Sequence, residues 1–162
     1  DSDAGTFCIK VDSVQSITND LCANAINVVV NVPCVTGSTV NSTFDGTLPT
    51  CGGTNSSVGN VWYKFTATGT NSTVNLSAVT NSLDPVLAVY DSCGGNSIYC
   101  IDVGVSNQGE SVNFTTVVGV TYLVSVKQYD SDDGSFCIDV TDQLSNSVQE
   151  ICYVTFQFQT VQ

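Results

Sequence analysis

The sequence contains no histidine, arginine or methionine, and its three lysines stand against fifteen carboxylates. Without histidine, neither a Ser-His-Asp nor a Cys-His catalytic device can be assembled. Several carboxylates, Glu110 among them, are available to a glycosidase, but no pattern pairs two of them as acid and base. We therefore predict that the chain is not an enzyme.

The shortage of basic residues also limits the partners. A net charge of −12 repels the phosphates of nucleic acids and the surface of anionic membranes. No apolar run approaches the roughly 20 residues that cross a bilayer as a helix. We expect neither nucleic-acid binding nor membrane insertion.

Eight cysteines are the most informative residues that the sequence does have. Zinc sites usually combine cysteine with histidine or use CxxC pairs, and both patterns are absent. An even number of cysteines, spread through a sequence rich in Thr, Asn and Ser, predicts disulfide bonds. Disulfide bonds in turn predict an extracellular or cell-surface location.

Short apolar runs bounded by Gly, Asn, Asp and Ser recur along the chain, which is typical of an antiparallel β-sandwich. The predicted strands are Ile26–Val32, Val61–Ala67, Thr73–Val79, Pro85–Asp91, Ser97–Val103, Ser111–Val117, Val120–Lys127 and Ser135–Val140. One helical turn is predicted to begin near Asn19 or Asp20, either of which could cap it. The predicted fold class is all-β, an antiparallel sandwich stapled by disulfides.

An internal repeat organises the chain. Asp1–Val11 (DSDAGTFCIKV) is identical to Asp130–Val140 (DSDDGSFCIDV) at eight of eleven positions, and a polar stretch and then a cysteine follow each copy. We predict a complete sandwich repeat over 19–140, with linkers at 12–18 and 141–151. Residues 1–11 are predicted to be the closing strand of a preceding repeat, and 152–162 the opening strand of a following one, or else exchanged strands. The alternative is two similar edge strands within one fold.

Several segments of the central unit resemble a known family. They are NDLCANAI, PTCGG, VWYKFTAT, SLDPVLAVYDSCGG, IYC and GVTYLVSVKQYDSDDGSFCIDV. Together they resemble cysteine-containing relatives of the bacterial pre-peptidase C-terminal domain, which occur in tandem in secreted and surface proteins. The resemblance implies a jelly-roll-like sandwich and a non-catalytic accessory role. One departure is that family members often carry Asp-Asp after the second cysteine of the short loop, whereas Cys100 is followed by Ile101 and Asp102.

Two disulfides are predicted from short loops. Cys93 and Cys100 bracket turn glycines and fit a hairpin disulfide, and Cys34 and Cys51 flank a loop without a strand of its own. A bridge across a loop of about 15 residues stabilises by roughly 3 kcal/mol in the chain-entropy model.

The other four cysteines, Cys8, Cys22, Cys137 and Cys152, leave two alternatives. In the first, Cys22 joins Cys137, and Cys8 and Cys152 complete neighbouring units. In the second, Cys8–Cys22 and Cys137–Cys152 clamp the linkers. Connectivity cannot be deduced from sequence alone.

The acidic loop Asp130–Gly134 is the candidate cation site. Asp130, Asp132 and Asp133, with help from Asp84, could supply oxygen ligands to calcium, although the spacing is not that of an EF-hand. The alternative is a solvated β-turn, which also favours Asp and Gly. No other cofactor is expected.

Glycans are the other ligands that the sequence raises. N-glycosylation sequons occur at Asn41, Asn55, Asn71, Asn75 and Asn113, and we expect all five in loops or at strand ends. Trp62 could form part of a sugar-stacking platform, but within its strand we expect it in the core.

Two functions follow. The first is a structural repeat unit of an extracellular fibre, stalk or adhesin, which assembles end to end with copies of itself or with adjacent repeats through terminal strands and disulfides. The segment Cys152–Gln162 supports it, because Val154, Phe156 and Phe158 alternate with polar residues as in a strand that buries one face. The alternative is a carbohydrate-binding accessory domain of a secreted hydrolase.

Overall fold

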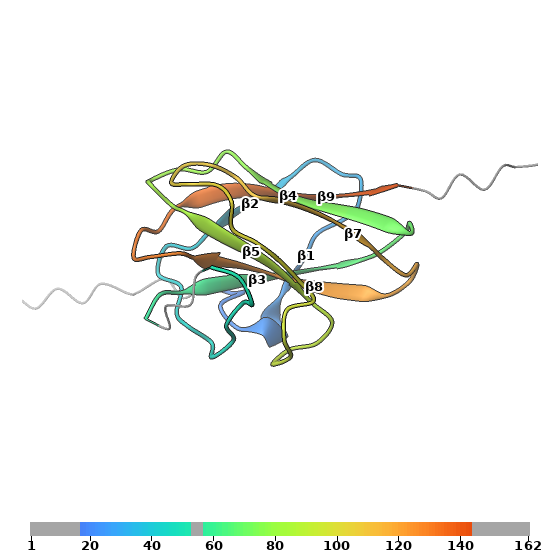
Figure 1. Ribbon diagram of the computed structural model, residues 1–162, viewed down its shortest axis with the longest axis horizontal. Helices are drawn as coiled ribbons and strands as arrows, with labels where there is room; N and C mark the ends of the chain where they lie inside the picture. Colours follow the sequence, from blue (N-terminus) through green and yellow to red (C-terminus); the bar gives the residue numbers. More distant parts are fainter. Residues whose placement is uncertain (1–16, 53–56, 144–162) are drawn as a thin grey trace, which may run out of the picture.

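Two β-sheets stacked face to face form the fold of this computed structural model, which describes residues 17–52 and 57–143 (Figure 1). The five-stranded sheet has the order β1 (Ile26–Asn27), β3 (Asn60–Thr66), β8 (Thr121–Gln128), β5 (Pro85–Tyr90), β6 (Tyr99–Ile101). The four-stranded sheet has the order β2 (Val35–Ser38), β9 (Ser135–Gln143), β4 (Asn71–Ser77), β7 (Ser111–Thr115). Neighbours are antiparallel except β1 and β3, which are parallel. The predicted all-β, jelly-roll-like sandwich stapled by disulfides is confirmed.

Alternation along the strands of the four-stranded sheet determines which side chains enter the core. In β9, Phe136, Ile138 and Val140 are buried, and the residues between them are only partly buried. Val74 and Leu76 of β4 are buried in the same cluster, between the two sheets. Successive side chains of a strand point to opposite faces, so each of these strands contributes every second residue to the core.

The central strands of the five-stranded sheet are covered on both faces. All six residues of β5 are buried, because its inner face meets the other sheet and its outer face is covered by the segment around Cys22. A second apolar cluster forms there, in which Trp62 stacks at a tilt on Tyr90 with 5.1 Å between ring centroids.

The predicted helical turn is present as the 3₁₀ helix η1 (Cys22–Asn24), but its predicted cap is wrong. Leu21 occupies the N-cap position and makes no side-chain cap. Asn19 instead donates a hydrogen bond from Nδ2 to the Trp62 carbonyl over 2.9 Å, and Asp20 accepts one from the Thr43 amide over 2.6 Å.

Most strand bounds lie within two residues of the prediction, and larger differences occur at three places. The strand expected over Ile26–Val32 is limited to β1, and Asn31 there has a positive φ of 60°. β2 was missed, since VTGS is short and carries a glycine. β9 continues to Gln143, beyond the Val140 at which we placed the end of the unit.

Three disulfides are present among the described residues, and none has the predicted partners. They are Cys22–Cys93, Cys34–Cys137 and Cys51–Cys100, with Cα–Cα distances of 5.8, 5.5 and 5.6 Å. The predictions Cys93–Cys100, Cys34–Cys51 and Cys22–Cys137, and the pairs Cys8–Cys22 and Cys137–Cys152, are therefore wrong as to partners. Cys8 and Cys152 themselves lie outside the described residues, as do the segments 1–11 and 152–162.

Strand register explains the two wrong loop bridges. Cys100 lies opposite Ala88 in the β5–β6 hairpin, so Cys93, which follows β5, is not across from it. Cys34 immediately precedes β2, whose residue Thr36 lies opposite Cys137. Each bridge thus joins segments that the sheets bring together, over sequence separations of 49 to 103 residues.

Candidate functional site

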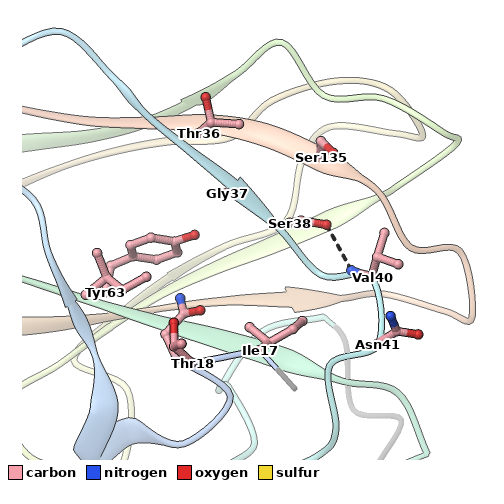
Figure 2. Close-up of a pocket in the computed structure, with 11 residues that line it drawn as sticks. Ile17, Thr18, Thr36, Gly37, Ser38, Val40, Asn41, Tyr63 and Ser135 are labelled. Carbon is pink, nitrogen blue, oxygen red and sulfur yellow. Dashed lines mark hydrogen bonds between the residues drawn. The ribbon is translucent and has the colours of Figure 1, made fainter. Parts of the chain in front are cut away.

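An open pocket lies where β1 and β2, the edge strands of the two sheets, face each other. We call it the β2 pocket, and it is a cavity of about 450 Å³. Its lining consists of Ile17–Asn19, Ile26, Thr36–Ser38, Val40, Asn41, Tyr63 and Ser135 (Figure 2). None of these residues carries a charge, although the chain as a whole has a net charge of −12.

Tyr63 is the most deeply placed residue of the β2 pocket. Its side chain is almost fully buried, and Figure 2 shows its hydroxyl directed toward β2. Gly37 of β2 makes this possible, because a Cβ at that position would lie 2.1 Å from the Tyr63 hydroxyl. Burial raises the pKa of Tyr63 to about 12, and a hydrogen bond with the Asn19 side chain acts in the opposite direction. Tyr63 is therefore a neutral hydroxyl at physiological pH.

The polar groups of the pocket suit a neutral ligand. Hydroxyl and amide side chains of Thr36, Ser38 and Asn41 surround the opening, and the Ser38 hydroxyl accepts a hydrogen bond from the Val40 amide over 3.1 Å (Figure 2). Ile17, Ile26 and Val40 supply apolar surface beside them. Such a site can hold an uncharged segment of protein or a sugar, and sequence reasoning missed it because β2 was missed.

Trp62 lies in the core, as expected, so it cannot be an exposed sugar platform. It is 0% exposed, and its Nε1 donates a hydrogen bond to Asp45 Oδ2 over 2.6 Å. Lys127 is buried nearby, where its Nζ donates to the Val58 carbonyl over 2.8 Å and lies 4.9 Å from the centre of the Phe44 ring. Burial lowers the pKa of Lys127 to about 8, against the opposing effect of Asp45.

The acidic loop follows β8 at the surface. Asp130 and Asp132 are exposed, Asp133 is partly buried, and Asp130 Oδ1 accepts a hydrogen bond from the Asp132 amide over 3.1 Å. Burial raises the pKa of Asp84, and Asp102, Asp130 and Glu110 raise it further. Within residues 17–52 and 57–143, no three His, Cys, Asp or Glu side chains gather closely enough to hold a metal ion. The calcium site stays a prediction.

The sequons are less uniform than expected. Asn41 lies in a turn and Asn71 begins β4, but Asn75 and Asn113 lie inside β4 and β7, so the expectation that all five lie in loops or at strand ends is wrong for these two. Asn113 donates from Nδ2 to the Thr73 hydroxyl over 2.7 Å, whereas Asn55 lies outside the described residues.

Comparisons with known proteins agree with this geometry. A family model described as "Galactose binding domain-like", whose name associates it with T9SS, matches residues 18–139. The chain belongs to this family. Among solved structures, the galactose-binding-domain-like unit is similar to the pre-peptidase C-terminal domain of collagenase from Bacillus anthracis, at 19% identity and a TM-score of 0.49 over 72% of this chain and 93% of that one. The resemblance predicted from the sequence is confirmed by these findings. A search among curated proteins found no match.

Disulfides and family membership bear on location. The three disulfides, together with the association of this galactose-binding-domain-like family with a secretion system, indicate a secreted or cell-surface protein. In the described part of the chain, no helix is long and apolar enough to span a membrane.

Proposed function

We propose that this chain carries one complete unit of a non-catalytic structural array, in which galactose-binding-domain-like units follow one another in a secreted or cell-surface protein such as a fibre, stalk or adhesin. The observation that carries the proposal is the place of β9 in the fold. β9 lies between β2 and β4 in its sheet, and both of its edges are paired.

Asp1–Val11, the first copy of the β9 sequence, cannot take the position between β2 and β4, because β9 itself occupies it. Phe136, Ile138 and Val140 of β9 are buried between the sheets, and Phe7, Ile9 and Val11 occupy the corresponding places in Asp1–Val11. A strand with the same apolar face needs the same kind of core. Since β9 already occupies that position here, the first copy has its place in another unit.

The cysteines support the same interpretation. Cys8 corresponds to Cys137, which is bonded to Cys34, so Cys8 is expected to bond the counterpart of Cys34 in a preceding unit. Cys152 follows the second copy as Cys22 follows the first, and Cys22 is bonded to Cys93. Cys152 is therefore expected to bond the counterpart of Cys93 in a following unit.

The test is to determine the sequence of the full-length protein on both sides of this chain and to map its disulfides by mass spectrometry. Further GxFCI blocks at a spacing near 129 residues are expected, with Cys8 and Cys152 bonded to cysteines of the flanking units. Flanking sequence without further copies would refute the array. So would a bond from Cys8 or Cys152 to a cysteine of this unit.

A second candidate is a carbohydrate-binding accessory domain of a secreted hydrolase, favoured by the uncharged hydroxyl and amide groups of the β2 pocket. The chemistry suits a neutral sugar, and the description of the family points the same way. A glycan array answers this: micromolar binding that is lost in Tyr63→Phe and Ser38→Ala would support it. Binding unaffected by both substitutions would place the glycan elsewhere.

A further inference from the structure

The chain joins the described sandwich at one end and leaves it at the other. Ile17 lines the β2 pocket together with Ser135, the first residue of β9. Gln143, the last residue of β9, lies opposite Asn71, the first residue of β4. We call the part of the surface with the β2 pocket, which Ile17 lines, the N-terminal pole. The end of the sandwich with the β3–β4 and β7–β8 turns is the C-terminal pole (Figure 1).

Sequence spacing leaves very little chain between the poles of two consecutive units. At the offset of the repeat, the position of Gln143 corresponds to Val14, and two residues, Gln15 and Ser16, lie between that position and Ile17. Three Cα–Cα steps reach at most about 11 Å. Two units joined by so short a connection must touch, with the C-terminal pole of one against the N-terminal pole of the next.

The C-terminal pole exposes an uncharged group of apolar side chains. The Ala67 amide donates to the Val120 carbonyl, and the Gly119 amide donates to the Ala67 carbonyl, which holds the Val117–Val120 turn there. The Asn31 amide donates to the Val140 carbonyl near the end of β9, and Val28–Val30 line a small cavity with Thr66 and Thr68. The exposed valines, each 41 to 62% accessible, are Val29, Val32, Val117, Val118 and Val120. Residues 28–32 and 116–121 contain no charge. Val117, Val118 and Val120 share one turn, and exposed apolar side chains that lie together mark interaction surfaces.

The β2 pocket has the properties that such a surface needs in a partner. It is concave, it offers Ile17, Ile26 and Val40, and its lining carries no charge. Two copies of a chain with a net charge of −12 repel each other, so the surfaces by which they meet are best free of carboxylates. Both poles satisfy this condition at the residues named.

We propose that consecutive units dock head to tail, with the valines of the C-terminal pole of one unit seated in the β2 pocket of the next. The occupant of the pocket is thus a second copy of the unit. This interface rests on the proposed function, because it takes Asp1–Val11 as the end of a preceding unit. Since two different surfaces meet, the contact repeats without closing and gives a linear array.

The experiment uses the whole 162-residue chain with any free thiols alkylated. Val118→Asp changes the C-terminal pole and Val40→Asp the N-terminal pole, and Val103→Asp, at a position 79% exposed between β6 and β7, is the matched control. A short linker supplies an effective concentration of about 1 mM, so association is measured by sedimentation up to that concentration. Circular dichroism checks that each variant is folded.

We expect wild type and the control Val103→Asp to associate. Val118→Asp and Val40→Asp should each remain monomeric when measured separately. Mixed in equal amounts, the two monomeric variants should form a dimer that grows no further, because each keeps one intact surface. A monomeric wild type, an equal effect of Val103→Asp, or a mixture that does not dimerise would overturn the interface. Galactose binding that Val40→Asp abolishes, without any association, would assign the pocket to a sugar instead. If flanking copies exist and the mixture fails, only the interface is wrong.

Discussion

The two edges of the sandwich are built in opposite ways. At the edge formed by β6 and β7, the rings of Tyr99 and Phe114 lie 4.8 Å apart and close the space between the sheets. At the edge formed by β1 and β2, neither strand carries an aromatic residue. The rings of Tyr63 and Phe136 meet one strand further in, with 6.0 Å between centroids, and the β2 pocket of about 450 Å³ remains outside them. The comparison shows that a sandwich of this size can seal one edge with aromatic side chains and leave a pocket at the other.

The open edge is held by other means. β1 has two residues and β2 has four, and short edge strands offer few unpaired backbone groups to unwanted partners. The Cys34–Cys137 bridge fixes the start of β2 to β9. A covalent bond within the four-stranded sheet therefore anchors the open edge, whereas ring packing between the two sheets closes the other edge.

The largest expected effect comes from removing that bond. Cys34→Ala together with Cys137→Ala releases a separation of 103 residues and should lower the free energy of unfolding by about 4–5 kcal/mol. Urea denaturation measures the loss, and hydrogen exchange should show it first in the β2 amides. The paired control is Cys51→Ala with Cys100→Ala, which should leave β2 protected. Equal protection of β2 in both variants would contradict this account of the open edge.

Removing a ring from the closed edge should have the next largest effect. Phe114 is buried and contacts Tyr99, Phe65 and Tyr122 at centroid distances of 4.8 to 6.3 Å. Phe114→Ala should cost about 3–5 kcal/mol, because it creates a cavity between the sheets. Thermal unfolding measures the change, with the exposed Tyr129→Ala as a control of small effect. A comparable loss in both variants would mean that the aromatic closure adds little.

Filling the open edge from within should have a smaller effect. Gly37→Ala places a methyl group 2.1 Å from the Tyr63 hydroxyl and should cost about 1–3 kcal/mol through overpacking. The same methyl group would also lie 2.6 Å from Cε2 of the buried Phe136 ring, so Tyr63→Phe, which removes only the contact with the hydroxyl, should restore part of the stability of Gly37→Ala. A double-mutant cycle by urea denaturation tests this. Additive losses would show that the contact with the Tyr63 hydroxyl contributes little to the cost.

The smallest effect is a pH dependence at the floor of the β2 pocket. The pKa of Tyr63 is about 12 in the folded chain against 10.0 for an ordinary tyrosine, so folding favours the protonated phenol. This contribution is fully present below pH 10 and is lost as the pH rises toward 12. Between pH 10 and pH 12, the free energy of unfolding should therefore fall less in Tyr63→Phe than in wild type. The measurement uses alkylated protein. A profile identical to that of wild type would refute the assignment.

Much of the fold could be predicted from local pattern. Alternation in Ser135–Val140 and the apolar run Pro85–Asp91 predicted β9 and β5 to within a few residues, because strands that bury a face need those side chains whatever their neighbours are. β2 could not be predicted in this way. Its four residues, VTGS, form a strand only because β9 supplies hydrogen-bond partners opposite Val35–Ser38.

The candidate site was less accessible to sequence reasoning than the fold. No motif links Ile17, Gly37 and Tyr63, and their meeting at the β2 pocket depends on how the two sheets are stacked. The acidic loop and the sequons do have motifs, but no residue of the acidic loop lines that pocket, and among the described sequon asparagines Asn41 alone does. Motifs report what a segment can bind, whereas a pocket between sheets is a property of their packing.

The sequence by itself determined the class of this protein: strand periodicity, cysteine number, charge and the internal repeat are all properties of short segments or of totals. The disulfide partners were decided only by tertiary structure. Cys34 bonds Cys137 and Cys22 bonds Cys93 because a bridge requires Cα atoms about 5.5–6 Å apart, and only the sheet order brings these residues to that distance. The same sheet order decided that one edge is sealed and that the other is open.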